Sequence, residues 1–279
     1  MFALDHIVIL VRDLATAIDD YTALGFTVVP GGEHQGGASH NALIAFADDS
    51  YLELLAFQRP PLPTEQPSPL ERRFRQRQAA GEGLVDFALL PEDIQGTIAT
   101  AAGRGLALEG PFPGSRVRPD GQRVAWQLGI PQAPALPFLC ADVTPRALRV
   151  PQGEVRRHAN SVTGVAGLAV AVSDLGRYVE GYRSLLGVEP RPGPALPVPD
   201  AQGAHFMLPS AVIALVTPAS GGSPLHNHLA QRGEGPFALW LHARDVARSG
   251  RLDPARSHGA WIEMVADDPS TAHLSAGWR

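Results

Sequence analysis

A histidine and a glutamate lie in two apolar stretches of the chain, and both are residue types that can bind a metal or transfer a proton. His6 lies in LDHIVILV, residues 4–11, and Glu53 lies in YLELLAF, residues 51–57. Both stretches are typical of strands, in which alternate side chains share a face. Glu53 then shares a face with Tyr51 and with apolar residues, where a buried carboxylate is costly unless it is paired or bound to a metal. The alternative is that this face is solvated and that Glu53 is an ordinary exposed residue.

A glycine-rich loop carries a second pair of candidate groups. His34 and Asn41 flank the loop QGGASHN, which is of the kind that closes over ligands. An imidazole whose pKa lies near neutrality can act as a general base, so His34 is the candidate catalytic residue and Asn41 a candidate substrate-binding residue. The alternative is a plain hairpin loop with a surface histidine.

Three arginines surround a predicted hairpin ahead of a tryptophan. Arg116, Arg118 and Arg123 flank the turn Arg-Pro-Asp-Gly, and Trp126 follows. A guanidinium can clamp an anionic substrate through paired hydrogen bonds. We therefore take Arg118, Trp126 and Tyr51 as further candidate substrate-binding residues. Solvated hairpin charges are the alternative for at least two of the three arginines.

The elements that must position these groups form a phrase that occurs four times: an apolar strand, an aspartate, a helical stretch and a glycine. The aspartates are Asp13, Asp93, Asp174 and Asp245. Each stands where a strand ends and a helix is predicted to begin, so its carboxylate can accept hydrogen bonds from the first backbone N–H groups of the helix. Four copies of one unit indicate an architecture built by duplication.

Each phrase begins a unit of one strand, one helix and three further strands (βαβββ), here called a module. In module one the strands are expected at residues 4–11, 26–29, 41–47 and 51–57, and the helix at 14–24. Module two repeats this order from Leu84, and module three spans residues 165–217. Module four, which begins at Ala238, has room for only one or two strands after its helix and is expected to be truncated. The pattern predicts an α+β fold.

A second level of repetition predicts two domains. The segment SPLERRFRQRQAAGEG from Ser68 is echoed by SPLHNHLAQRGEG from Ser223, so the first two modules together resemble the last two. We place the first domain at residues 1–143, a linker at 144–161 and the second domain at 162–279. The sequence leaves open whether the modules pair within each half or across the halves.

Composition excludes several classes of function. The net charge of −5 gives no electrostatic footprint for nucleic acid, and no apolar run approaches the roughly 20 residues that span a bilayer. Cys140 is the only cysteine, which excludes an intramolecular disulfide and a thiolate zinc cluster. The basic helix ERRFRQRQAA from Glu71 is interpreted as a solvated crossover. We expect a soluble cytoplasmic protein that binds neither nucleic acid nor membranes, and leave open whether it is a monomer or a homodimer.

The fourfold pattern, with His6 and Glu53 in their strands, resembles the vicinal oxygen chelate superfamily, which includes glyoxalase I, extradiol dioxygenases, and fosfomycin and bleomycin resistance proteins. More narrowly, GGEHQGGASHNALIAF, SRVRPDGQRVAWQLGIP and LPFLCADV resemble the glyoxalase-like domain family. The resemblance covers nearly the whole chain and implies two glyoxalase-like domains. Because this fold hosts isomerases, lyases, dioxygenases and binding proteins, it implies no single activity.

The resemblance also implies a metal site. In that superfamily a divalent metal is bound by one residue from the first strand and one from the fourth strand of each paired module. Transferred residue by residue, this gives His6 and Glu53 from module one and Asp86 from module two, with Ala141 or Cys140 opposite Glu53. Three such ligands with water would hold Zn, Mn, Fe or Ni, which would polarise substrate oxygens as a Lewis acid. The alternative is a site without metal, in which Asp86 is structural and His6 lines an organic-ligand pocket.

The second half offers no such ligands, because Gly167, Ile213 and Ala238 take the corresponding positions. We therefore expect the first half to bind a small oxygen-rich or aromatic molecule, either as a metal-dependent lyase, isomerase or dioxygenase or, alternatively, as a metal-free protein that sequesters a drug or metabolite.

Overall fold

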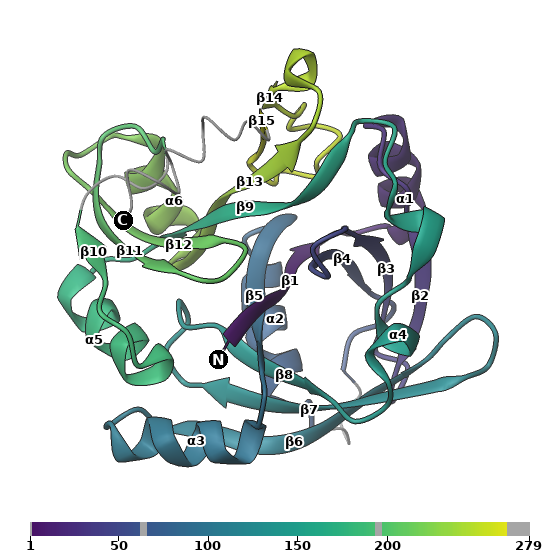
Figure 1. Cartoon of the computed structure of the whole chain (residues 1–279), viewed down its shortest axis with the longest axis horizontal. Helices are drawn as coiled ribbons and strands as arrows, with labels where there is room; N and C mark the ends of the chain where they lie inside the picture. The colour runs from purple at the N-terminus through teal and green to yellow at the C-terminus, as the bar shows by residue number, and fades with distance from the viewer. Residues whose placement is uncertain (1, 62–65, 193–196, 267–279) are drawn as a thin grey trace.

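The first half of the chain forms a closed barrel in the computed structural model, which describes residues 2–61, 66–192 and 197–266. Its strands are β1 (Phe2–Leu10), β2 (Val29–His34), β3 (Ser39–Ala45), β4 (Tyr51–Phe57), β5 (Gly83–Pro91), β6 (Leu108–Val117), β7 (Arg123–Pro131) and β8 (Phe138–Asp142). They follow one another around the barrel in the order β1-β4-β3-β2-β6-β7-β8-β5. Modules one and two therefore pair within the first half, and antiparallel pairs β1–β5 and β2–β6 join them into a ring (Figure 1).

The second half forms an open sheet beside the barrel. Its strands are β9 (Val162–Ala171), β10 (Arg191–Pro192), β11 (Ala201–Met207), β12 (Val212–Pro218), β13 (Gly235–Ala243), β14 (Gly250–Arg251) and β15 (Ile262–Ala266), in the order β10-β11-β12-β9-β13-β15-β14. The predicted α+β class and the shortened fourth module are confirmed.

The predicted helix of the fourth copy is absent from the described residues. After Asp245 the chain makes only a three-residue 3-10 turn, η2 (Val246–Arg248), before β14. Gly250 and Pro254 follow within the span where the other copies are helical, and both residue types disfavour a helix interior.

Aspartates cap the helices of the other three copies, as predicted. The side chains of Asp13, Asp93 and Asp174 accept hydrogen bonds from backbone N–H groups in the first turn of α1 (Leu14–Ala23), α3 (Ile94–Gly103) and α5 (Leu175–Leu186). Serines cap the two helices that share the second-level repeat, α2 (Pro69–Gln78) and α6 (Pro224–Arg232). The repeats seen in the sequence are therefore repeats of helix starts.

The second strand of module one lies further along the chain than the sequence predicts, at β2 (Val29–His34) rather than residues 26–29. Glycine makes this possible, because β2 closes the ring against β6. A Cβ at Gly32, whose φ is +124°, would lie only 1.9 Å from the backbone oxygen of Val117. A glycine-rich segment, which propensity argues against as a strand, is thus used where two backbones approach closely.

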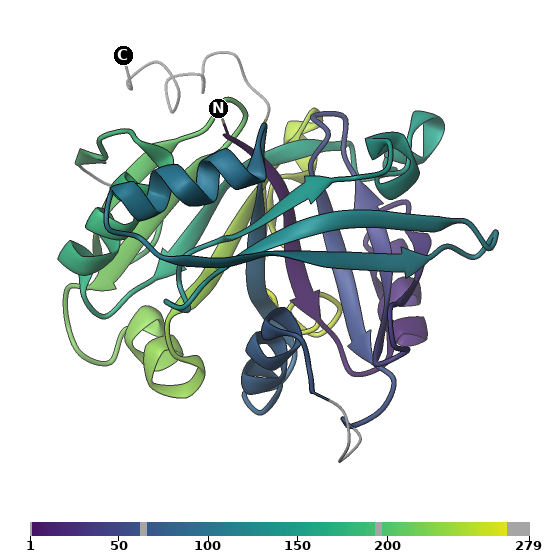
Figure 2. The same cartoon turned by 90° about the horizontal axis from the view of Figure 1, so that it is seen from below.

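Helix α2 is not the solvated crossover that its basic sequence predicts. It lies at one end of the barrel (Figure 2), where Arg73 is 8% exposed and Phe74 5% exposed. Phe74 packs among the apolar side chains of the barrel interior, such as Leu55 and Phe138. The helix therefore forms part of the wall of the barrel's interior.

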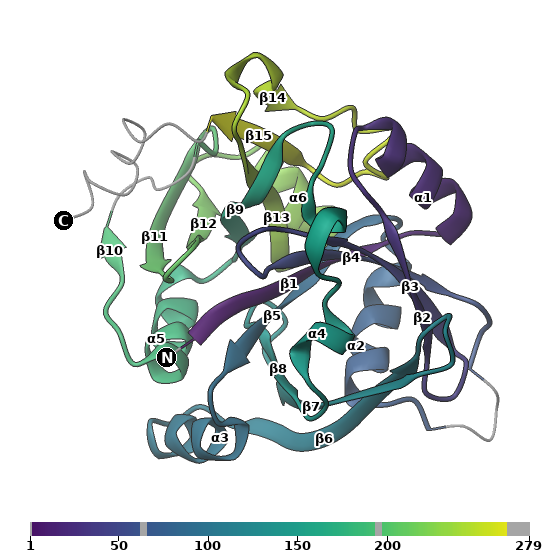
Figure 3. The ribbon, with the colours of Figure 1, turned by 45° about the vertical axis from the view of Figure 1, so that its right-hand side comes forward.

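One apolar core joins the two halves. The outer face of the barrel, with Ile7 and Leu89, belongs to the same cluster as Leu168 and Leu239 of the second sheet. Figure 3 shows β9 and β13 running alongside β1 and β5. The predicted linker, residues 144–161, carries α4 (Arg146–Arg149) and η1 (Gly153–Arg156). Within the described residues no helix is long and apolar enough to cross a membrane.

Candidate functional site

A cavity of about 430 Å³ lies inside the barrel, a volume suited to a small organic molecule. Its wall is largely apolar and aromatic, with Leu55, Phe57, Phe74, Phe112, Trp126 and Phe138. Polar side chains interrupt this wall, among them His6, His34, Asn41, Glu53 and Arg116. A few polar groups in an aromatic cavity are typical of a site that orients a ligand.

Strand register explains why these polar groups converge. Residues opposite one another on neighbouring strands share a face, and His34 of β2 lies opposite Arg116 of β6. Glu53 of β4 lies opposite Val8 of β1, whose side chain belongs to the barrel interior. Alternation along β1 then turns His6 to the same side as Val8.

Glu53 is the centre of the polar cluster and is 6% exposed. Asn41 Nδ2 donates a hydrogen bond to Glu53 Oε1 at 2.7 Å. The Nε2 atom of His34 lies 3.5 Å from Oε1, and the Nε2 atom of His6 lies 3.4 Å from Oε2. One amide and two imidazoles thus face a single buried carboxylate, which offsets the cost of burying it.

His6 is fixed on three sides. Its ring stacks on Tyr51 with centroids 4.7 Å apart and meets the edge of Phe138 at 5.3 Å. Asp5 Oδ2 lies 2.7 Å from Nδ1 of His6. A register irregularity in β1 between Leu4 and His6 allows these two consecutive side chains to meet. The Asp5 carboxylate accepts a hydrogen bond from Nδ1 and so holds the ring in the orientation in which Nε2 faces Glu53.

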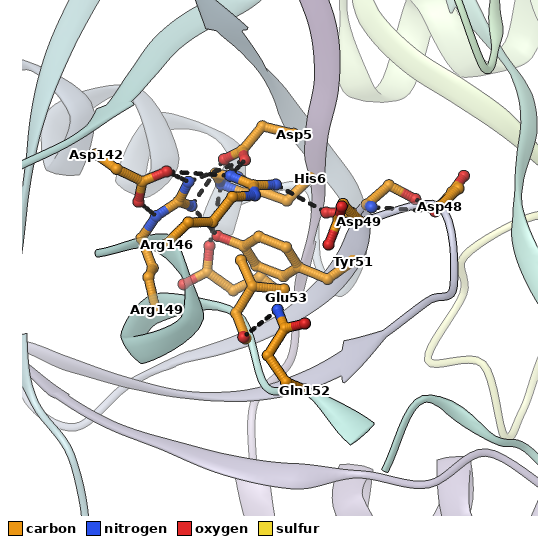
Figure 4. Close-up of polar contacts among 12 residues, drawn as sticks. Asp5, His6, Asp48, Asp49, Tyr51, Glu53, Asp142, Arg146, Arg149 and Gln152 are labelled. Carbon is orange, nitrogen blue, oxygen red and sulfur yellow. Dashed lines mark hydrogen bonds and ion pairs between the residues drawn. The ribbon is translucent and has the colours of Figure 1, made fainter. Parts of the chain in front are cut away.

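Asp5 is in turn held by a buried network of ion pairs with two arginines, which the sequence analysis did not predict. Arg149 donates to both carboxylate oxygens of Asp5, to Asp142 and to the Tyr51 hydroxyl, and Arg146 donates to Asp5 at 2.6 Å. Figure 4 shows the two arginines gathered with Asp5 and Asp142 beside the Tyr51 ring. The available signals were a carboxylate directly before His6 in an apolar strand and two arginines three residues apart in the linker.

Charge pairing dominates the protonation of this network. Burial by itself would raise the pKa of Asp5, but the Arg149 guanidinium and the His6 ring hold that pKa well below its ordinary value. Burial by itself would lower the pKa of Arg149, and the Asp5 carboxylate instead raises it. Asp5 is therefore ionised throughout the neutral pH range and remains an acceptor for His6.

His34 has the opposite environment. Burial lowers the pKa of His34, and the nearby Glu53 carboxylate opposes that shift without cancelling it. Its Nδ1 is hydrogen-bonded to Ser39 Oγ at 3.0 Å, and its ring meets the Trp126 edge. The neutral imidazole is the form that can accept a proton, and Glu53 would stabilise the cation formed.

The structure does not bring Asp86 together with His6 and Glu53. Asp86 is fully buried, does not line the cavity, and has both carboxylate oxygens hydrogen-bonded to Arg73 of α2. Val8 lies between Glu53 and Asp86 in the sheet, which puts their backbones two strand spacings apart, roughly 9.6 Å.

The positions next to His6 on β5 and β8 offer no replacement for Asp86 as a ligand. Ala88 faces His6 on β5, and Phe138 lies beside Ala88 on β8. In the described ranges, no three histidine, cysteine, aspartate or glutamate side chains are grouped so that they could hold a metal ion. The residues therefore do not fit the predicted metal site.

The remaining candidates divide between cavity and surface. Asn41, Tyr51 and Trp126 line the cavity, as does Cys140, whose thiol has a pKa raised by burial. Arg118 does not line it and pairs with Asp120 at 2.9 Å in the hairpin. Of the three arginines around the hairpin, the one that lines the cavity is Arg116, two residues before Arg118 on β6.

Comparison with known proteins identifies the architecture. A model of the glyoxalase-like domain family matches residues 4–186. A hypothetical protein from Staphylococcus aureus has a similar structure at 13% identity, with a TM-score of 0.72 over 95% of this chain and 100% of that chain. A variant of 4-hydroxymandelate synthase from Streptomyces coelicolor is also similar at 13% identity, with a TM-score of 0.63 over 95% of this chain and 93% of that one. At these identities both structures show the fold alone. No curated protein matches the sequence.

Proposed function

The chain belongs to the glyoxalase-like domain family of the vicinal oxygen chelate superfamily, and on that premise we propose that its first barrel binds a small organic molecule with an aromatic or apolar body. The observation that carries this proposal is Glu53, a buried carboxylate that faces two imidazoles and an amide inside an aromatic cavity. A barrel stabilised only by packing would have no need of such a cluster, because each polar group in it loses hydration on burial.

The proposal uses the chain's own side chains and no metal. Of the three predicted ligands only His6 and Glu53 face one another, and Asp86 is neutralised by Arg73. Breaking that ion pair to free Asp86 for a metal would leave the Arg73 guanidinium buried without its counter-charge, which is unfavourable. We therefore favour the metal-free alternative. The cytoplasmic location and the choice between monomer and homodimer stay predictions.

Thermal stability measured with and without a chelator tests this function. Protein purified without chelator is mixed with a panel of small aromatic compounds that includes acids, amides and amines. A compound bound only by the native state raises the melting temperature, and we expect the same rise in the presence of EDTA. Stoichiometric Zn, Mn, Fe or Ni in the purified protein, lost together with ligand binding in the His6→Ala variant, would contradict the metal-free proposal.

A second candidate function is proton transfer on the bound molecule, as in an isomerase. It is favoured by the neutral His34 ring, whose Nε2 lies 3.5 Å from a carboxylate that would stabilise its protonated form. In this candidate, His34 takes a proton from an acidic carbon of the ligand and returns it, while Asn41 holds Glu53 in place.

A further inference from the structure

We propose that Arg116 is the receptor for an anionic group of the ligand, so that the barrel takes a small aromatic or apolar carboxylate. This inference rests on the proposed function and names its substrate class. It starts from the state of the Arg116 side chain, which is 3% exposed and lines the cavity.

The Arg116 guanidinium is held in place but has no counter-charge. Its Nε donates to the backbone oxygen of Gly31 at 2.9 Å, and its Nη2 donates to the backbone oxygen of Arg149 at 2.7 Å. In the part of the chain that the structure describes, Nη1 makes no hydrogen bond and no carboxylate lies within ion-pair distance. Two carbonyls orient the group, while its charge remains available to a ligand.

The other two buried arginines are each paired with a carboxylate. Among the described residues three arginines are buried: Arg73, Arg116 and Arg149. Arg73 holds Asp86, and Arg149 holds Asp5 and Asp142. Burial of an unpaired cation is costly, so the isolated charge of Arg116 is a cost that an anionic ligand would offset.

The charge survives its burial. Burial lowers the pKa of Arg116, and the acidic groups of Tyr51 and Glu53 oppose that shift. The ordinary pKa of a guanidinium lies so far above neutrality that Arg116 stays protonated at neutral pH. Its planar fork suits a carboxylate, which can accept two parallel hydrogen bonds.

The neighbouring wall indicates what the carboxylate is attached to. Arg116, Gly114 and Phe112 lie at alternate positions of β6, and Trp126 of β7 lies opposite Gly114. A Cβ at Gly114 would lie 2.2 Å from Nε1 of the indole, so the glycine makes room for the Trp126 ring across β6. An aromatic or apolar body packed on Trp126 would place its carboxylate at Arg116 and the adjoining carbon toward His34.

Titration calorimetry with phenylacetate and its neutral isostere phenylacetamide tests the inference. We expect the wild-type protein to bind the acid at least about tenfold more tightly than the amide, as a charge-assisted bidentate contact supplies. The Arg116→Gln variant should bind the two with nearly equal affinity and keep the amide affinity of the wild type. Arg116→Lys, which keeps the charge but loses the fork, should discriminate to an intermediate degree and serves if Arg116→Gln does not fold.

The outcomes separate this inference from the function on which it rests. Equal binding of acid and amide by the wild type, or discrimination that survives Arg116→Gln, overturns the anion receptor and leaves the cavity proposal standing. Discrimination lost in Arg118→Gln instead would also overturn it, because Arg118 lies outside the cavity. Failure of the whole aromatic panel to bind overturns both.

Discussion

His6 and His34 face the same carboxylate and are prepared for different tasks. Asp5 fixes one nitrogen of His6, and Tyr51 and Phe138 fix its ring. His34 has only a serine hydroxyl on its second nitrogen, and burial keeps it neutral. His6 is therefore a fixed part of the cavity wall, while His34 suits proton transfer.

Deuterium exchange tests this division at the residue scale. Phenylpyruvate, which carries acidic protons beside its carbonyl, should exchange them with D2O faster in the presence of the protein. Replacement of the base by His34→Gln should reduce the catalysed rate by about 10²-fold or more.

The ordinary pKa of a histidine side chain is about 6.5. Because burial lowers the pKa of His34, its ring stays neutral to a lower pH than that. The catalysed rate should therefore hold from pH 8 to about 6.5 and fall only in more acidic buffer. An unchanged rate in His34→Gln, with binding retained, would exclude this role.

Alternation within each strand tells which residues share a face with His6 and which share a face with Glu53, but it does not predict that the two side chains meet. Their 3.4 Å approach depends on the parallel pairing of β1 with β4. The same alternation misplaces Asp5, because the register irregularity before His6 puts consecutive side chains together. Arg116 lies within β6 and lines the cavity, whereas Arg118 lies just beyond the end of β6 in the hairpin. No local sequence pattern specifies where β6 ends.

At the scale of elements, α2 shows how a basic sequence becomes part of a wall. Arg73 spans from the helix to Asp86 and to backbone oxygens of Pro131, Ala133 and Leu136. Sequence reasoning took the charges of this helix for a solvated face, since nothing local marks which arginine meets a buried acid. The strand bounds were easier, and β4 (Tyr51–Phe57) has its predicted limits.

Urea denaturation tests the role of the Arg73–Asp86 pair. Arg73→Met should lower the free energy of unfolding by about 3–5 kcal/mol, because it leaves Asp86 as an uncompensated buried charge. The double variant Arg73→Met/Asp86→Leu should recover most of that loss, since an apolar pair of similar size needs no counter-charge. A double variant no more stable than the single one, or one that loses a bound metal, would indicate that Asp86 has another task.

In the whole molecule, the fold is repeated, whereas the proposed site lies in the first half alone. The order of strands and helices along the chain, three of the four capping aspartates and the shortened fourth module follow from the repeats, because they depend on local patterns. In the second half, Gly167 and Ala238 belong to strands where Trp240, 1% exposed, packs in an apolar cluster. The open second sheet and the closed first barrel were beyond sequence reasoning, since ring closure depends on contacts between distant strands.

Tryptophan fluorescence under ligand titration tests whether the cavity of the first barrel is the binding site. Of the chain's four tryptophans, Trp126 lines that cavity, while Trp240 and Trp261 lie in the second half and donate to Glu263. A bound aromatic compound should quench the wild-type emission, and the quenching should disappear in Trp126→Phe while the rise in melting temperature persists. Quenching that survives in Trp126→Phe and disappears in Trp240→Phe would place the ligand in the second half and contradict a binding site in the first barrel.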